Sequence, residues 1–203
     1  MPEEGKLRGY FNIALFAESD ELISLCTDLA CSNLANQADG YLLGEHAWPH
    51  VTLCQFSLNE SEISSVWSQI ESIQSDPFKI RFSHIYILAG VMEHAGKRWV
   101  GLAVTPSKEL MSLQKTIYDK LLALNIQSTT PSSSYFPHLT WARTGGTSPL
   151  SMSHFPAQTF WHEPYSFGLS LGRTDKNNFG IYEERLFPLP VRSHNVMKAG
   201  SPK

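Results

Sequence analysis

The alternation of apolar and polar residues along the chain predicts a mixture of short strands and helices. Residues 10–16 form a short apolar run typical of a buried strand, and apolar residues then recur at helical spacing over residues 22–29. The same two periods predict further helices over residues 63–73 and 110–124, and further strands over residues 78–91 and 98–104. The pattern therefore indicates an α+β protein.

Capping residues and turn residues mark where these elements begin and end. Ser19 or Asp20 can cap the first long helix. Thr105 and Pro106 predict the start of the helix over 110–124, because a hydroxyl cap and a proline in the first turn both favour one. Loops are expected around Gly40 and Gly44, over residues 127–134, and over the turn-rich residues 144–164, which we expect to cover a site. Strands over 165–173 and 179–187 are expected to form a hairpin.

Two segments share a motif of an aromatic residue, proline, histidine, any residue and threonine. The first is residues 48–52, around His50, and the second is residues 136–140, around His138. An offset of 88 positions, which is 138 minus 50, aligns residues 10–56 with residues 98–144 without a gap. Strand propensity does not favour histidine, so strand patterning does not explain why the Pro-His-x-Thr motif occurs in both segments. We infer two strand–helix–strand halves related by a pseudo-twofold axis, with the motif strands near it.

Side chains alternate along a strand, so His50 and Thr52 share one face, as do His138 and Thr140. Two such strands side by side would place two imidazoles and two hydroxyls around one small volume. In-line transfer at phosphorus needs one group to take a proton and another, opposite it, to give one, and imidazole titrates near neutral pH. Threonine hydroxyls can donate hydrogen bonds to the non-bridging oxygens. This scheme requires no metal and no cofactor, and it predicts a bell-shaped pH profile.

Composition and charge narrow the class of protein further. The chain has 203 residues, is 42% hydrophobic and 17% charged, and has a formal net charge of −3. These values fit one domain, which we place at residues 9–188 with a tail at 189–203, and they disfavour a protein that coats nucleic acid by bulk charge. They leave room for a small anionic substrate.

The location follows from what the sequence lacks. The charged N-terminus has no apolar segment of a signal peptide, and no apolar run is long enough to span a membrane. Three cysteines, an odd number without zinc-type spacing, fit free thiols in a reducing compartment. We therefore expect a cytoplasmic monomer with no membrane partner.

The paired Pro-His-x-Thr motifs and the residues Thr140-Trp141-Ala142-Arg143 resemble the 2H phosphoesterase superfamily, which includes LigT-like RNA cyclic phosphodiesterases, also called 2′-5′ RNA ligases. The resemblance covers roughly residues 9–188. It implies two lobes whose antiparallel sheets flank a central cleft, with the helices outside. It also implies acid–base roles for His50 and His138, and phosphate binding by Thr52 and Thr140. The implied partner is an RNA terminus, an oligonucleotide or a nucleotide.

Further candidates for substrate binding are Arg143, Tyr182, Trp48 and Phe179. In a regular strand Arg143 faces away from His138, which favours a surface ion pair over a phosphate or nucleotide contact. The three aromatic residues could stack a base, although core packing is the simpler interpretation. A metal site of His46, His50 and Cys54 is disfavoured, because Pro49 prevents a helical ligand pair. The remaining histidines are expected to be structural or solvent-facing: His84, His94, His154, His162 and His194.

The sequence thus predicts a metal-independent phosphodiesterase acting on a 2′,3′-cyclic phosphate or a 2′-5′ linkage of RNA or nucleotides. Two alternatives stay open. One is a nucleotide or RNA-end binding module without turnover. The other is a phosphoesterase of a small cyclic-phosphate metabolite, for which the mild negative charge leaves room.

Overall fold

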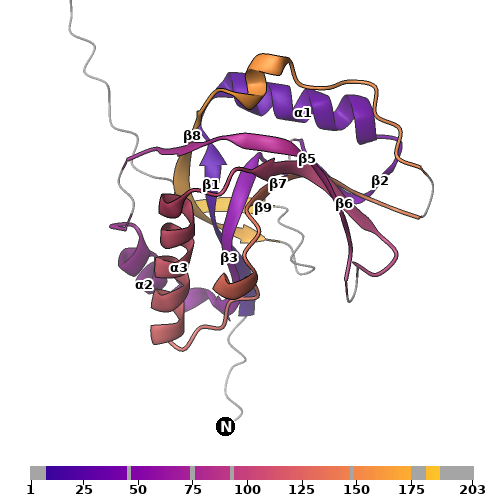
Figure 1. Cartoon of the computed structure of the whole chain (residues 1–203). Helices are drawn as coiled ribbons and strands as arrows, with labels where there is room; N and C mark the ends of the chain where they lie inside the picture. The colour runs from indigo at the N-terminus through magenta and orange to yellow at the C-terminus, as the bar shows by residue number, and fades with distance from the viewer. Residues whose placement is uncertain are drawn as a thin grey trace, which may run out of the picture.

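Two antiparallel sheets with helices packed against them make up the computed structural model of the chain (Figure 1). The structure describes residues 8–44, 47–73, 76–91, 94–146, 149–174 and 182–187. Within these residues, no helix combines the length and the apolar character needed to cross a membrane. The expected α+β class with two antiparallel sheets is confirmed.

The larger sheet has the strand order β3-β1-β8-β4, and a fifth strand, β9, also pairs with β8. All its pairings are antiparallel. Its strands are β1 (Arg8–Ala17), β3 (His50–Asn59), β4 (Phe78–Ile80), β8 (Tyr165–Thr174) and β9 (Tyr182–Phe187). The predicted C-terminal hairpin is present as β8 and β9.

The smaller sheet has the order β2-β7-β6-β5, again antiparallel throughout. Its strands are β2 (Ala38–Leu42), β5 (Phe82–Ala89), β6 (Arg98–Val104) and β7 (His138–Thr144). The expectation of a loop around Gly40 is wrong, because this segment is β2. Its sequence contains Asp39 and Gly40 and has weak strand propensity. The strand forms because its backbone pairs with β7.

Within the described residues, α-helices and short 3₁₀ turns connect the strands. The helices are α1 (Asp20–Leu34), α2 (Ile63–Ile70) and α3 (Lys108–Ala123), and the 3₁₀ turns are Glu60–Glu62, Ser132–Ser134 and Gln158–Trp161. The Ser19 hydroxyl caps α1 by accepting the N–H of Leu22 at 3.3 Å, as predicted. The prediction for α3 is wrong by two residues: Ser107, not Thr105, accepts the N–H of Leu110 at 3.1 Å. Either hydroxyl suits a cap, and the backbone path decides between them.

The two halves are interlocked rather than side by side. Helix α1 belongs to the first half but packs mainly against β7 of the second, and α3 packs against β3 of the first. Figure 1 shows α1 lying over the smaller sheet and α3 running beside β3. The apolar faces of both helices are buried in one continuous core with the motif strands. Apolar burial of about 2 kcal/mol per large side chain therefore holds each motif strand to the opposite half.

The expectation that the turn-rich segment 144–164 covers a site is not met by its described residues, 144–146 and 149–164, none of which lines the cleft described below. The side chain of Asn33 in α1 donates to the carbonyl of His154 at 2.7 Å and accepts the N–H of Ser153 at 2.9 Å. Gln37 makes a similar contact, donating to the carbonyl of Ser151 at 3.1 Å. These bonds fasten the segment along α1, because a connection over the surface needs partners for its backbone groups.

Candidate active site

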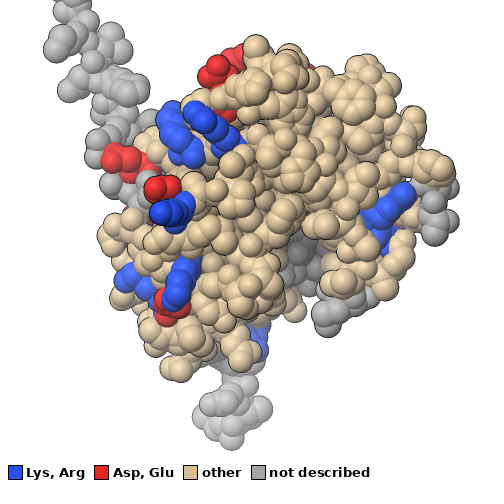
Figure 2. All heavy atoms as spheres, viewed as in Figure 1, with Lys and Arg blue, Asp and Glu red and all other residues tan. Residues whose placement is uncertain are grey.

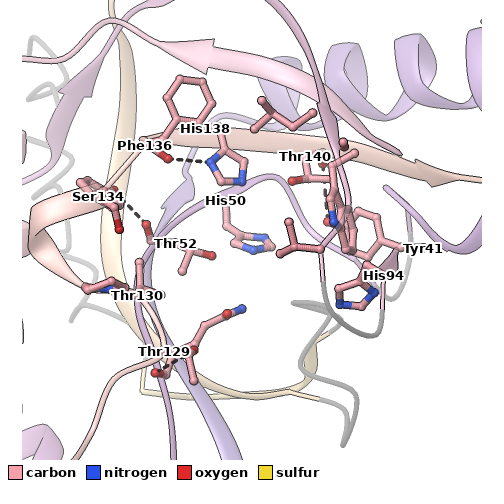
Figure 3. A pocket seen from close by; sticks show the side chains of 17 residues that line it. Tyr41, His50, Thr52, His94, Thr129, Thr130, Ser134, Phe136, His138 and Thr140 are labelled. Atoms are coloured by element: carbon pink, nitrogen blue, oxygen red, sulfur yellow. Dashed lines mark hydrogen bonds between the residues drawn. The ribbon is translucent and has the colours of Figure 1, made fainter. Parts of the chain in front are cut away.

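Two histidines from different sheets face one cleft. His50 begins β3 in the larger sheet, and His138 begins β7 in the smaller one. Both line a cleft of about 490 Å³ together with Thr52 and Thr140. Figure 3 shows the two rings close together at its centre, with the threonines on either side. The structure brings together the four motif residues that the sequence places on equivalent strands.

Each imidazole is held by the same backbone contact. Nδ1 of His50 lies 2.6 Å from the carbonyl oxygen of Trp48, and Nδ1 of His138 lies 2.7 Å from that of Phe136. A carbonyl oxygen only accepts hydrogen bonds, so we infer that Nδ1 carries the proton in both rings. A neutral ring then has its lone pair on Nε2, the atom that can act as a base.

Burial lowers the pKa of both histidines. His50 is 6% exposed, and its desolvation lowers its pKa from 6.5 to about 4; the bond to Trp48 opposes this change, and the neighbouring His138 adds to it. Desolvation also lowers the pKa of His138, against its bond to Phe136. Among the described residues, no Lys, Arg, Asp or Glu lines the cleft. An anionic phosphate between the rings would raise both pKa values, because it favours the charged form.

Two residues that the sequence analysis did not single out hold the threonine hydroxyls. The side-chain amide of Asn12 in β1 donates to Oγ1 of Thr52 at 3.0 Å, and the hydroxyl of Tyr86 in β5 lies 2.8 Å from Oγ1 of Thr140. Because Asn12 donates to it, the Thr52 oxygen is left with its own proton to give to a ligand. The one available signal was a polar residue, Asn12, within the apolar run 10–16.

Asn12 is fully buried, and its Oδ1 has no hydrogen-bond partner among the described residues. An unsatisfied buried polar atom costs about 1–3 kcal/mol, so an apolar residue would serve packing better here. The position is therefore explained by its contact to Thr52 rather than by stability.

A β-bulge interrupts both motif strands at equivalent positions. Leu53 is an extra residue in β3 relative to β1, and Trp141, 88 positions later, is an extra residue in β7 relative to β6. A bulge reverses the alternation of side chains beyond it. As a result Gln55 returns to the face of His50 and lines the cleft.

Arg143 occupies the position equivalent to Gln55 and is turned by the bulge to the face of His138, opposite to the face expected in a regular strand, while its expected ion pair is present as a 3.7 Å contact to the Asp39 carboxylate. Its side chain is buried and does not line the cleft. The guanidinium donates to the carbonyl of Asp39 at 2.7 Å and to Nδ1 of His94 at 3.0 Å, and it lies 5.8 Å from the ring centre of Trp99. Arg143 thus supports one wall of the cleft from behind. His94, expected to be structural or solvent-facing, lines that wall.

A tyrosine from each half reaches the motif strand of the other half. The hydroxyl of Tyr135 donates to the carbonyl of Thr52 at 2.8 Å, and that of Tyr41 donates to the carbonyl of Thr140 at 3.5 Å. Burial raises the pKa of both phenols, so both keep the proton that they donate. These reciprocal bonds help to set the spacing of the two histidine strands.

Of the three aromatic candidates, Trp48 has a described side chain, and it does not line the cleft. Trp48 is 39% exposed, packs edge-on against Phe16 and is not among the lining residues. Tyr182 begins β9, and its side chain lies outside the described part of the structure; Phe179 lies outside the described residues altogether. The aromatic residues that do line the cleft include Tyr41, Trp99 and Phe136.

Within the described residues, no three His, Cys, Asp or Glu side chains are grouped so as to hold a metal ion. His46, one member of the disfavoured metal set, lies outside those residues. The chemistry that the cleft itself offers is proton transfer at two imidazole Nε2 atoms and hydrogen bonding by two threonine hydroxyls.

The sequence pattern of one protein family matches residues 23–161; its description is the 2′-5′ RNA ligase superfamily. No curated protein sequence matches the chain.

Solved structures share the fold at low sequence identity. A structure described as a phosphoesterase superposes with a TM-score of 0.59 and 14% identity, covering 90% of this chain and 99% of the other. Escherichia coli LigT complexed with 3′-AMP superposes with a TM-score of 0.60 and 14% identity, covering 83% of this chain and 90% of LigT. LigT complexed with ATP superposes with a TM-score of 0.57 and 14% identity, covering 90% of this chain and 97% of LigT.

Proposed function

Because this chain belongs to the 2′-5′ RNA ligase superfamily, we propose that it is a metal-independent phosphodiesterase that opens a 2′,3′-cyclic phosphate or cleaves a 2′-5′ linkage of RNA or a nucleotide. The observation that carries the proposal is the pair of imidazoles that face one cleft from equivalent strands, each with Nδ1 hydrogen-bonded to a backbone carbonyl oxygen. Two groups that can exchange a proton at Nε2, with a phosphorus between them, supply both proton transfers of an in-line displacement.

In hydrolysis, His138 takes a proton from the attacking water and His50 gives a proton to the leaving oxygen. In the reverse reaction the two roles exchange. Thr52 and Thr140 donate hydrogen bonds to the non-bridging oxygens, where negative charge develops. Asn12 and Tyr86 orient these hydroxyls and do not touch the substrate.

Nucleotide ligands in LigT support a nucleotide or RNA end as substrate. The free thiols Cys26, Cys31 and Cys54 support action in a reducing compartment such as the cytoplasm.

The test is turnover of 2′,3′-cyclic nucleotides and 2′-5′-linked oligonucleotides in EDTA by the wild type and the His50→Ala and His138→Ala proteins. We expect activity that survives EDTA, a bell-shaped pH profile, and a loss of about 100-fold or more in either variant. Full activity in His138→Ala would remove the mechanism, and loss of activity with EDTA would favour a metal. Binding of a cyclic-phosphate nucleotide without product would indicate a binding module instead.

A further inference from the structure

The strand β5 forms an open edge of the smaller sheet. It is the last strand in the order β2-β7-β6-β5, and within the described residues no strand pairs with its outer side (Figure 1). The backbone N–H of Gly90 donates to the carbonyl of Lys97 at 2.8 Å, which fixes which residues bond to β6. Bonded pairs alternate along an antiparallel ladder, so Leu88 and Tyr86 also bond to β6.

The residues between these bonded positions face outward with their backbone. Ile85, Ile87 and Ala89 therefore direct their N–H and C=O groups away from the sheet. A row of such groups is a template on which another extended strand can pair.

This edge lacks the features that usually keep edge strands apart. Residues 82–91 contain no Lys, Arg, Asp, Glu or Pro. Two large apolar side chains are open to solvent, Ile87 at 53% and Leu88 at 43% of their surface. A bulge is present, but it lies between Phe82 and His84, before the outward-facing residues.

Three other edge strands show such protection. The strand β4 has only three residues and carries the exposed Lys79. The strand β2 carries Asp39, which pairs with Lys97. The outer side of β3 is covered by the loop before β7, where the N–H of Thr129 donates to the carbonyl of Gln55 at 2.8 Å. The open edge of β5 is therefore not a general property of this fold's edges.

We propose that the outer edge of β5 pairs with the β5 strand of a second copy of this chain, so that two smaller sheets form one continuous antiparallel sheet. A twofold axis at Ile87 places this residue opposite its own copy and Ile85 opposite Ala89 of the second copy. Each of these pairs exchanges both backbone hydrogen bonds. The dimer replaces the monomer expected from the sequence, because the open edge is visible only once the strand order is known.

The second copy suits this edge in charge and in size. With no Lys, Arg, Asp or Glu in either strand, no like charges meet across the axis. The larger Ile85 meets the smaller Ala89. On the other face of the strand, Tyr86 meets Leu88 of the second copy, so the apolar surface of one strand covers that of the other.

This pairing adjoins the two clefts without using the catalytic histidines. Leu88 lines the cleft, and the hydroxyl of Tyr86 lies 2.8 Å from Oγ1 of Thr140. Because a continuous antiparallel sheet keeps like faces on the same side, both clefts open on one face of the dimer.

The first experiment is sedimentation velocity of the full chain from about 1 μM to about 1 mM. A stable interface buries about 800 Å² on each partner, which is more than one edge strand offers, so we expect a weak dimer with a Kd of about 10–100 μM. Ile87→Lys should raise the Kd about tenfold or more, because it places two ammonium groups opposite each other at the axis.

The matched control is Leu122→Lys. It also replaces an exposed apolar residue by lysine, on α3 and away from the edge, and should leave the Kd within about twofold. Urea midpoints of both variants check that each one folds. A wild type that stays monomeric at about 1 mM, or a dimer that Ile87→Lys leaves unchanged, would overturn the proposal.

Amide hydrogen exchange of the wild type, followed by NMR, tests the pairing without any variant. Raising the protein concentration should slow exchange at Ile85, Ile87 and Ala89, whose N–H groups become bonded. Exchange at Tyr86 and Leu88, which already bond to β6, should change less. A dimer in which the three outward amides gain no protection would contradict strand pairing. Neither measurement involves turnover, so failure here leaves the proposed function untouched.

Discussion

Individual residues in this cleft trade stability for reactivity. Asn12, behind the cleft, holds the Thr52 hydroxyl, while its buried Oδ1 has no hydrogen-bond partner in the described part of the chain. His50 is buried as a neutral imidazole, and its ring is poised by one backbone carbonyl. Both features cost folding free energy. A phosphate between the rings would stabilise a charged imidazole and offset its desolvation, and it would accept the hydrogen bond of the Thr52 hydroxyl.

The buried His50 predicts a pH dependence of stability. Its pKa is about 4 in the folded chain against 6.5 when exposed, so the unfolded chain binds the proton more readily. Stability is therefore unaffected by this group above pH 6.5 and falls as the pH drops below it, by about 3 kcal/mol at pH 4.

Urea unfolding between pH 7 and pH 4 should show a shallower loss of stability in His50→Gln than in the wild type. The exposed His84→Gln protein is the control and should follow the wild-type curve. Parallel curves for the wild type and His50→Gln would contradict the buried neutral state of His50.

At the scale of elements, paired bulges shape the cleft. The bulge at Trp141 brings the backbone of β7 close to β6, and only glycine fits opposite it. A Cβ at Gly101 would lie 2.1 Å from the carbonyl oxygen of Leu139 and 2.8 Å from Cα of Thr140. The overlap is with backbone atoms of the motif strand itself, so a side chain there must displace it.

Gly101→Ala should lower the free energy of unfolding by about 2 kcal/mol or more and reduce turnover, because Thr140 moves with the strand. Gly44→Ala is the matched control, since a Cβ at Gly44 meets no atom within 4 Å, and should change stability by less than about 0.5 kcal/mol. Urea midpoints and kcat measure the two effects. Equal stability of the two variants would mean that β7 does not bulge against Gly101.

At the scale of the whole molecule the net charge is small, and no Lys, Arg, Asp or Glu is among the described residues that line the cleft. The net charge is −3, and Figure 2 shows basic and acidic side chains lying near one another on a largely uncharged face. A long RNA gains affinity by releasing counterions along a basic path. The described residues offer a cleft of about 490 Å³ instead, in which we propose that one phosphate lies between the two histidines.

Extending a 2′-5′ dinucleotide to about 20 nucleotides should therefore lower KM by less than about threefold. Raising salt from about 50 to about 200 mM should change KM for the dinucleotide by a similarly small factor. Steady-state assays with a fluorescent oligonucleotide series measure both. A KM that drops tenfold or more with length, and rises steeply with salt, would indicate an extended RNA path.

Local pattern alone predicted a large part of the molecule. The α+β class, the Ser19 cap and the C-terminal hairpin follow from periodicity and capping chemistry, which act over a few residues. The Pro-His-x-Thr repeat predicted which four side chains would meet, because a duplicated motif on duplicated strands carries its geometry with it.

Only the tertiary structure decided the rest. The strand β2 exists through its pairing with β7, and the bulges at Leu53 and Trp141 reflect register against neighbouring strands. Asn12 reaches Thr52 from another strand, and Arg143 reaches behind the cleft to His94. Each of these contacts joins residues far apart in the chain, and a one-residue change in register turns every side chain beyond it to the opposite face, which no local pattern encodes.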